Sequence, residues 1–348
     1  MRRRISLATR DTLRSFEIRN FRLFFTGQAV SQVGNWMRSV TLALLVLELT
    51  DSGVAVGLLT ACQFAPVLIL GAFAGVVADR SDKRRLLLIV QSFAMVQSGV
   101  LMGLAFMDRP PLWALFVASL ASGTAAAFEN PARRAFVVEM VPESHVQNAV
   151  SLNSAVMTGS RVVGPALAGF LITAFGYGWA LAFDTVSYAA VLIGLWMLDP
   201  SMLRPASVAE RAKGQVREGL RYVRSVPELR ISLLMMVVIG TLTFNFAVTF
   251  PLFATRSLQG STTDFTLLLS LLSAGSFVGA LRAARRTEVE LHHVIRGSVL
   301  FGVTMAVLAA VPTVGVALPV AFVTGVASIT YMTSSTSILQ LRAEPTMR

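Results

Sequence analysis

Long apolar stretches recur along this chain from Phe21 to its C-terminal end. Each approaches the roughly 20 residues that a helix needs to cross the hydrocarbon core of a bilayer. The composition agrees, because only 14% of the residues are charged and 54% are hydrophobic, whereas soluble proteins average about 25% charged residues. The chain of 348 residues is therefore predicted to be a multi-pass membrane protein and not a series of soluble domains.

The apolar stretches predict helices, since a membrane β-barrel would show segments of about ten residues with alternating polarity. We expect an all-α polytopic membrane protein with ten membrane-spanning helices. Their predicted bounds are residues 23–48, 54–78, 86–107, 112–130, 148–174, 178–198, 229–255, 264–283, 294–311 and 314–337.

Basic residues concentrate in alternate loops of this predicted topology. One set of loops holds 26 of the 30 Lys and Arg residues, the other set holds only Arg109 and Arg256, and Arg38 and Arg161 fall within predicted spans. Basic loops near a membrane span resist translocation. The basic set is therefore predicted to be cytoplasmic, with both ends of this chain on the cytoplasmic side of the cell (inner) membrane.

The longest polar stretch divides the predicted helices into six and four. It predicts a six-helix half at residues 1–198, a cytoplasmic linker at 199–228 and a second half at 229–348. Weak self-similarity at an offset near 203 suggests a repeat, since Glu139–Pro142 aligns with Arg342–Pro345. The first half continues into a fifth helix after this segment, so we expect ten helices of a twelve-helix protein truncated at its C-terminal end.

The strongest motif is GVVADRSDKRR, Gly75–Arg85, after the second predicted helix. Gly75 is expected to allow close helix packing, and Asp79 to accept hydrogen bonds from a neighbouring helix N-terminus or an arginine. A plain basic loop is the alternative. The spacing resembles the signature loop of the major facilitator superfamily, although the second half has Ala283 in the acidic position. The resemblance implies a major facilitator fold, and a gating role for Gly75, Asp79, Arg80, Arg84 and Arg85.

Three further segments narrow the resemblance: Gly27–Met37, Glu129–Pro142 and Arg161–Leu171. They resemble the drug and siderophore exporters related to the enterobactin exporter and to macrolide efflux pumps. That resemblance implies secondary active export of a small amphipathic molecule by alternating access, commonly by proton antiport. Part of the third segment also resembles the helix 5 motif of antiporters, whose small residues let helices slide; ordinary helix packing is the alternative. The matching residues are Gly164, Pro165 and Gly169.

Three ionisable residues stand out inside the predicted spans, away from the span ends, where a charge is costly and usually functional. They are Arg38, Arg161 and Asp184. We expect Asp184 to pair with Arg38 or with Arg161, and protonation of Asp184 to be a step of the transport cycle. A fixed structural ion pair is the alternative.

Two other groups of residues have predicted roles. Glu129 and Arg134, beside Arg133 at the inner end of the fourth predicted helix, are expected to bridge to Asp79 when an inner gate closes; solvated loop charges are the alternative. The substrate cavity candidates are polar or aromatic residues at mid-depth, each of which alone would be only an interhelical hydrogen bond. They are Gln28, Gln32, Asn35, Trp36, Gln63 and Asn245.

An intramembrane enzyme is the main alternative class of function, and it would need a set of catalytic residues within the membrane-spanning helices. The three histidines, His145, His292 and His293, lie in predicted cytoplasmic loops, and no H-E-x-x-H, G-x-S-x-G or phosphate-loop motif occurs. We expect no enzymatic activity, no cofactor, no metal and no nucleic acid. The expected partners of a monomeric chain are the substrate, the proton and the lipid bilayer. Two alternative functions remain open: a lipid or peptide flippase of the same fold, and a fragment that does not transport.

Overall fold

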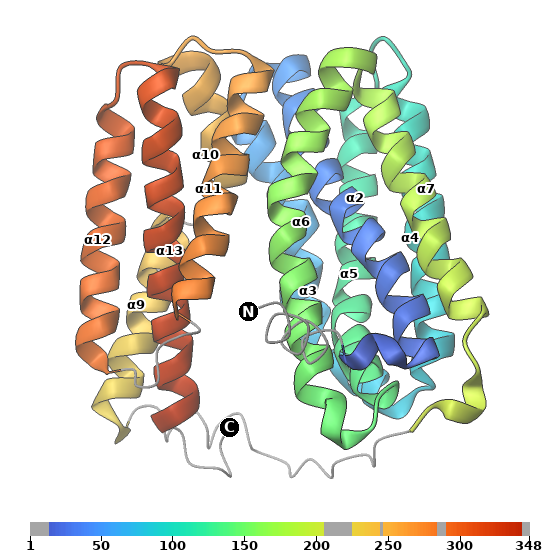
Figure 1. Ribbon diagram of the computed structural model, residues 1–348. Helices are drawn as coiled ribbons and strands as arrows, with labels where there is room; N and C mark the ends of the chain where they lie inside the picture. Colours follow the sequence, from blue (N-terminus) through green and yellow to red (C-terminus); the bar gives the residue numbers. More distant parts are fainter. Residues whose placement is uncertain (1–13, 205–224, 244–245, 284–289, 343–348) are drawn as a thin grey trace, which may run out of the picture. The chain divides into compact units, whose positions relative to one another are not determined.

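The computed structural model describes residues 14–204, 225–243, 246–283 and 290–342. The chain divides into two compact units, Met1–Val208 and Ala209–Arg348, and over the described residues its regular structure is entirely helical (Figure 1). The predicted linker at 199–228 falls largely outside these residues. The predicted division into two halves and a linker stays a prediction.

The first unit consists of long helices joined by short connections. The long helices are α2 (Arg19–Thr50), α3 (Gly53–Arg80), α4 (Lys83–Ala105), α5 (Leu112–Glu139), α6 (Val146–Phe175) and α7 (Tyr177–Trp196), and the short ones are η1 (Arg14–Glu17), η2 (Glu143–His145) and η3 (Pro200–Met202). Ser52 and Asp82 cap α3 and α4 by accepting backbone N–H groups of the first turn. Gly176, with φ of 90°, alone connects α6 to α7, a conformation that glycine adopts without strain.

The second unit has a similar make-up. Its elements are α9 (Pro227–Thr243), α10 (Phe246–Leu252), the π-helical turn η4 (Phe253–Ser257), α11 (Thr262–Ala283), α12 (Leu291–Ala310) and α13 (Val314–Arg342). Helix α13 packs against α11 and α12, as α5 packs against α3 and α4 in the first unit. The recurrence of this packing fits the repeat suggested by the sequence.

Nine helical segments among the described residues are long and apolar enough to cross a membrane. They are Gly53–Arg80, Lys83–Ala105, Leu112–Glu139, Glu143–Phe175, Tyr177–Trp196, Leu229–Ser257, Thr262–Arg282, Leu291–Ala310 and Val314–Ile338. They correspond to nine of the ten predicted spans. The tenth predicted span, residues 23–48, is helical as part of α2 but is not among these segments.

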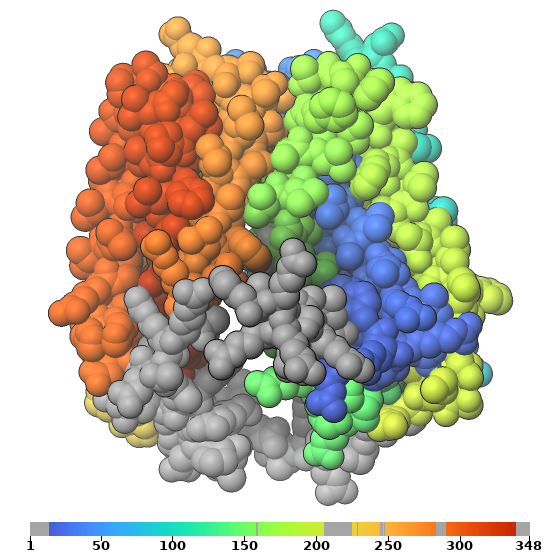
Figure 2. All heavy atoms as spheres, viewed as in Figure 1, coloured from blue at the N-terminus to red at the C-terminus, as the bar shows by residue number. Residues whose placement is uncertain are grey.

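Helix α2 is less apolar because it carries polar residues toward the interior of its unit. Gln28, Gln32 and Arg38 are each at most 5% exposed, and α2 packs against both α6 and α7. On the face shown in Figure 2, the blue surface of α2 lies between green α6 and yellow-green α7. Hydropathy alone underestimates the ability of α2 to span a membrane, because the polar groups of this helix face protein instead of lipid.

The outer surfaces of both units are apolar. Leu68 is 86% exposed in α3, Trp196 74% in α7 and Leu242 74% in α9. Exposed apolar side chains on this scale mark a surface that contacts an apolar environment. Together with the apolar helices, they identify a multi-pass membrane protein.

Glycines bring some helices unusually close, but Gly75 is not one of them. A Cβ built at Gly27 of α2 would lie 2.6 Å from the Ala190 carbonyl oxygen of α7, whereas one built at Gly75 meets no atom within 4 Å. Close packing at Gly75 is therefore not observed among the described residues, and the predicted role of this glycine stays a prediction. Gly279, which an offset near 203 places close to the position of Gly75 in the first half, does pack closely, against Ile329 and Val326.

Candidate functional site

A buried ion pair joins α2 to α7 in the first unit. Nη1 of Arg38 lies 3.0 Å from Oδ2 of Asp184, and the two residues are 4% and 0% exposed. Of the two partners that the sequence suggested for Asp184, the structure pairs it with Arg38. A buried carboxylate and guanidinium are stable together only when hydrogen bonds satisfy their remaining polar atoms.

Three neighbouring side chains provide most of those hydrogen bonds. Ser98 of α4 donates from Oγ to Asp184 Oδ2 at 2.7 Å, and the guanidinium of Arg38 donates to Tyr188 Oη at 2.7 Å and to Asn35 Oδ1. Helices α2, α4 and α7 therefore meet in one polar cluster, which we call the ion-pair cluster: Asn35, Arg38, Ser98, Asp184 and Tyr188. Sequence reasoning missed Ser98 and Tyr188, which carry no signal outside their spatial context.

Asp184 keeps one carboxylate oxygen available. Among the described residues, no hydrogen-bond partner reaches Asp184 Oδ1. A Cβ added at Gly34 of α2 would lie 2.9 Å from this oxygen. The site thus combines a charge-paired oxygen with one to which no described residue donates a hydrogen bond.

Arg161 lies apart from this pair. Its guanidinium carbon is 5.1 Å from the centre of the Trp36 ring, a distance typical of a cation–π contact, and its side chain is exposed. One turn further along α6, an added Cβ at Gly164 would lie 2.6 Å from Trp36 Cβ. Gly164 therefore lies on the face of α6 that approaches α2, and Pro165 and Gly169 are also buried.

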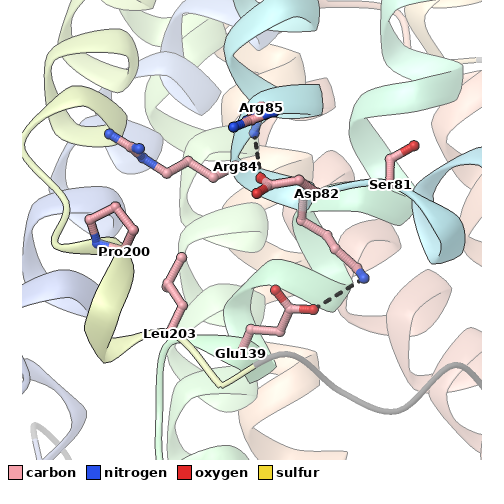
Figure 3. Close-up of a pocket in the computed structure, with 8 residues that line it drawn as sticks. Ser81, Asp82, Arg84, Arg85, Glu139, Pro200 and Leu203 are labelled. Carbon is pink, nitrogen blue, oxygen red and sulfur yellow. Dashed lines mark hydrogen bonds and ion pairs between the residues drawn. The ribbon is translucent and has the colours of Figure 1, made fainter.

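The basic loop after α3 is held by contacts that the sequence did not reveal. Nζ of Lys83 lies 3.2 Å from Oε1 of Glu139 at the end of α5, and Arg84 donates to the Leu195 and Trp196 carbonyl oxygens of α7 at 2.9 and 3.2 Å. The loop thereby ties α4 to α5 and α7. These contacts border a cavity of about 300 Å³ whose lining includes Ser81–Arg85, Glu139, Pro200 and Leu203 (Figure 3).

The predicted gate residues are only partly brought together. Glu129 pairs with Arg133 in the same helix, with Oε1 and Nε 3.5 Å apart, and it accepts a hydrogen bond from Gln28 at 3.5 Å. Arg134, Arg80 and Arg85 are exposed, and Asp79 is half-buried. No bridge from Glu129 or Arg134 to Asp79 is observed within the described part of the chain.

The predicted cavity residues that the structure describes lie on two helices, α2 and α3. Gln28 and Gln32 are buried, Asn35 belongs to the ion-pair cluster, and Trp36 is half-buried beside Arg161. Gln63 of α3 donates to the Ser39 hydroxyl of α2 at 3.1 Å, which is the interhelical bond foreseen as its alternative role. Asn245 lies outside the described residues.

The sequence matches a known family over almost its whole length. The pattern that defines the "Transmembrane secretion effector" family matches residues 11–346. Named relatives include the "Staphyloferrin A transporter" of Staphylococcus aureus, 24% identical over 262 residues, and "Macrolide efflux protein A" of Streptococcus pyogenes, 21% identical over 263 residues. The "Putative bacilysin exporter BacE" of Bacillus amyloliquefaciens is 26% identical over 267 residues. These matches cover 74–75% of this chain and 65% of each relative, so the chain spans about two thirds of their length.

Solved structures give the same fold. A bacterial homologue of the human lysosomal transporter Spinster, in an inward-facing and occupied conformation, aligns with a TM-score of 0.70 over 94% of this chain and 75% of its own, at 16% identity. The unoccupied form aligns with a TM-score of 0.66 at 12% identity, covering 94% of this chain and 76% of that one. From the family match and the shared fold, we conclude that this chain belongs to the transmembrane secretion effector family of major facilitator superfamily transporters.

Proposed function

We propose that this chain acts in a secondary active transporter that exports a small amphipathic molecule by alternating access, in exchange for protons. The names of its relatives support the direction of transport, because they include efflux and export proteins. The observation that carries the proton-coupling proposal is the buried Arg38–Asp184 pair, because ionisable groups inside a membrane protein are costly and often take part in proton transfer.

In the proposed cycle, Asp184 alternates between a charged and a protonated form. The charged form holds Arg38 through a 3.0 Å contact, and protonation at Oδ1 or Oδ2 would cancel that attraction. Arg38 would keep its bonds to Tyr188 and Asn35, while the link between α2 and α7 would weaken. Proton binding would thereby favour one arrangement of these helices over another.

We assign the basic loop to gating. In one state of this proposed gate, the Lys83–Glu139 ion pair and the hydrogen bonds from Arg84 to α7 hold one end of the unit together. In the other state, the gate is held by contacts of Asp79, Arg80, Glu129 and Arg134. The close contact of Gly164 with Trp36 would allow α6 to move against α2 without a bulky side chain between them.

The proposed placement follows from the basic loops. They support a cytoplasmic position for the ends of the chain in the cell membrane. We further propose that the protein works as a monomer and transports its substrate without changing it chemically.

The test uses everted membrane vesicles from a bacterial host that lacks its own drug exporters. The probes are radiolabelled erythromycin and 1-pyrenesulfonate, and an acidic vesicle interior supplies the proton gradient. The wild-type chain should accumulate at least one probe when the gradient is present, and Asp184→Asn should reduce that accumulation to the level of vesicles without the protein. Asp108→Asn, at an exposed position, is the matched control. Gradient-driven accumulation by Asp184→Asn at wild-type expression would eliminate the proton role.

A further inference from the structure

Arg161 differs from Arg38 and Arg133, two other arginines within helices of the first unit, because it has no carboxylate partner among the described residues. Arg38 pairs with Asp184 and Arg133 with Glu129, whereas no carboxylate of the described residues lies within ion-pair distance of Arg161. Within the described part of the chain, its guanidinium lies over the face of the Trp36 ring. At about 1.5 Å per residue, roughly 21 Å of helix separates Arg161 from either end of α6, which is farther than its side chain extends toward lipid headgroups.

An exposed polar stripe leads along α6 to this arginine. The stripe consists of Gln147, Ser151, Ser154 and Arg161, all of them exposed, at spacings of four, three and seven residues. At roughly 100° per residue, these positions fall within about 80° of one another around the helix. The hydroxyl groups of Ser151 and Ser154 donate to carbonyl oxygens of their own helix at 2.8 and 2.9 Å.

Exposed apolar residues occur on two sides of the same helix. Val150 and Phe175, 45% and 60% exposed near its two ends, lie within about 40° of Arg161 around the helix, and two others lie on the opposite side. Val163 and Phe170 are 51% and 63% exposed, and they point roughly 140–160° away from Gln147. Because a guanidinium at the middle of a membrane helix is costly against lipid, we infer that the side of α6 around Arg161 faces water or a ligand.

We propose that the polar stripe lines the substrate path, and that Arg161, supported by Trp36, binds the anionic group of an amphipathic carboxylate or sulfonate. A guanidinium offers two parallel N–H donors that match the two oxygens of such an anion. The indole stacks on the cation and adds an apolar surface beside it. This inference rests on the proposed function and narrows its substrate class to amphipathic anions.

The test measures binding at Trp36 itself. Trp113, Trp179 and Trp196, the other three of the four tryptophans, are replaced by Phe in the full chain, which is purified in detergent. Two probes share one fluorophore, the anion 1-pyrenebutyrate and the neutral 1-pyrenebutanol, and binding is read as energy transfer from Trp36 to pyrene. We expect the anion to bind about tenfold tighter than the alcohol. A tenfold ratio corresponds to about 1.4 kcal/mol, which is close to the net contribution of one hydrogen bond to a charged group.

The variants separate a ligand contact from a folding defect. Arg161→Gln should abolish the preference for the anion while leaving the affinity for 1-pyrenebutanol unchanged, and Arg161→Lys should restore part of the preference. Arg109→Gln, an exposed position outside the helices, should leave it intact. Equal affinities for the two probes in the starting protein, or a preference that survives Arg161→Gln, would overturn the inference. Either result leaves gradient-driven transport in vesicles, and hence the proposed function, unaffected.

Discussion

The guanidinium of Arg38 and the carboxylate of Asp184 stand 146 positions apart in the chain and lie 3.0 Å from each other inside the first unit. Because neither side chain reaches solvent to any useful extent, each depends on the other for charge compensation. The pair therefore fixes how α2 and α7 pack, whatever its role in transport.

Removing one member of the pair should destabilise the protein more than removing both. Asp184→Leu is expected to lower the free energy of unfolding by roughly 3–5 kcal/mol, because it leaves a buried arginine without its counterion. The double variant Arg38→Met/Asp184→Leu should recover most of that loss. Unfolding of the purified chain in mixed micelles provides the measurement, with Asp108→Asn as the exposed control. Unchanged stability of the single variant would refute this assignment.

The contact between α2 and α7 at Gly27 should not tolerate a methyl group. Gly27→Ala places a Cβ 2.6 Å from the Ala190 carbonyl oxygen, and overpacking of this kind costs roughly 1–3 kcal/mol. Gly71 of α3 is the matched control, because a Cβ there meets nothing within 4 Å. Gly71→Ala should be neutral or stabilising by roughly 0.5–1 kcal/mol. The measurement is the melting temperature of each variant in detergent. Equal changes for Gly27→Ala and Gly71→Ala would contradict the packing described.

The Lys83–Glu139 pair should show measurable coupling. Lys83 and Glu139 are 9% and 5% exposed, so a double-mutant cycle with Lys83→Met and Glu139→Gln is expected to give roughly 0.5–3 kcal/mol of interaction. The pair of Glu290 with His292 has a similar contact distance of 3.0 Å but is exposed, and its cycle should give about 1 kcal/mol or less. A larger coupling in the exposed pair would argue against a structural role for Lys83.

The charged carboxylate of Asp199 should stabilise the folded protein near neutral pH and lose this effect at acidic pH. The backbone N–H and hydroxyl groups of Ser201 donate to its carboxylate and lower its pKa below the usual 3.8. The stabilisation is therefore present above the unfolded-state pKa and is lost as the pH falls through the lower folded-state value. Melting temperatures between about pH 5 and about pH 3 should fall less steeply for Asp199→Asn than for wild type. Identical pH profiles would show that these hydrogen bonds do not favour the charged carboxylate.

Much of the fold follows from hydropathy, and the exceptions have physical causes. The predicted span at 23–48 became α2, whose Gln28, Gln32 and Arg38 lie inside the protein; a hydropathy average counts such residues against a membrane helix. Gly75 is a different case, because no atom of the described residues lies within 4 Å of a Cβ built there. A glycine in a sequence shows that close packing is permitted, but not which face of its helix has a neighbour.

The candidate site was predictable in its charged members and not in its geometry. The cost of a charge in the membrane singled out Arg38, Arg161 and Asp184 from the sequence, but left two partners open for Asp184. The choice depends on which faces of α2, α6 and α7 meet. Lys83 and Glu139 carried no comparable signal, because each lies among other charges near a helix end and only the packing of α4 on α5 brings them together.

Proton-coupled export by this chain can be tested most directly by following protons and substrate at the same time. The full chain is reconstituted into vesicles that contain 1-pyrenesulfonate, a permanent anion that cannot carry a proton itself, together with an internal pH indicator. We predict that outward movement of the anion acidifies the vesicle interior, and that Asp184→Asn abolishes this acidification. Exit of 1-pyrenesulfonate through the wild-type protein with no change of internal pH would contradict proton exchange.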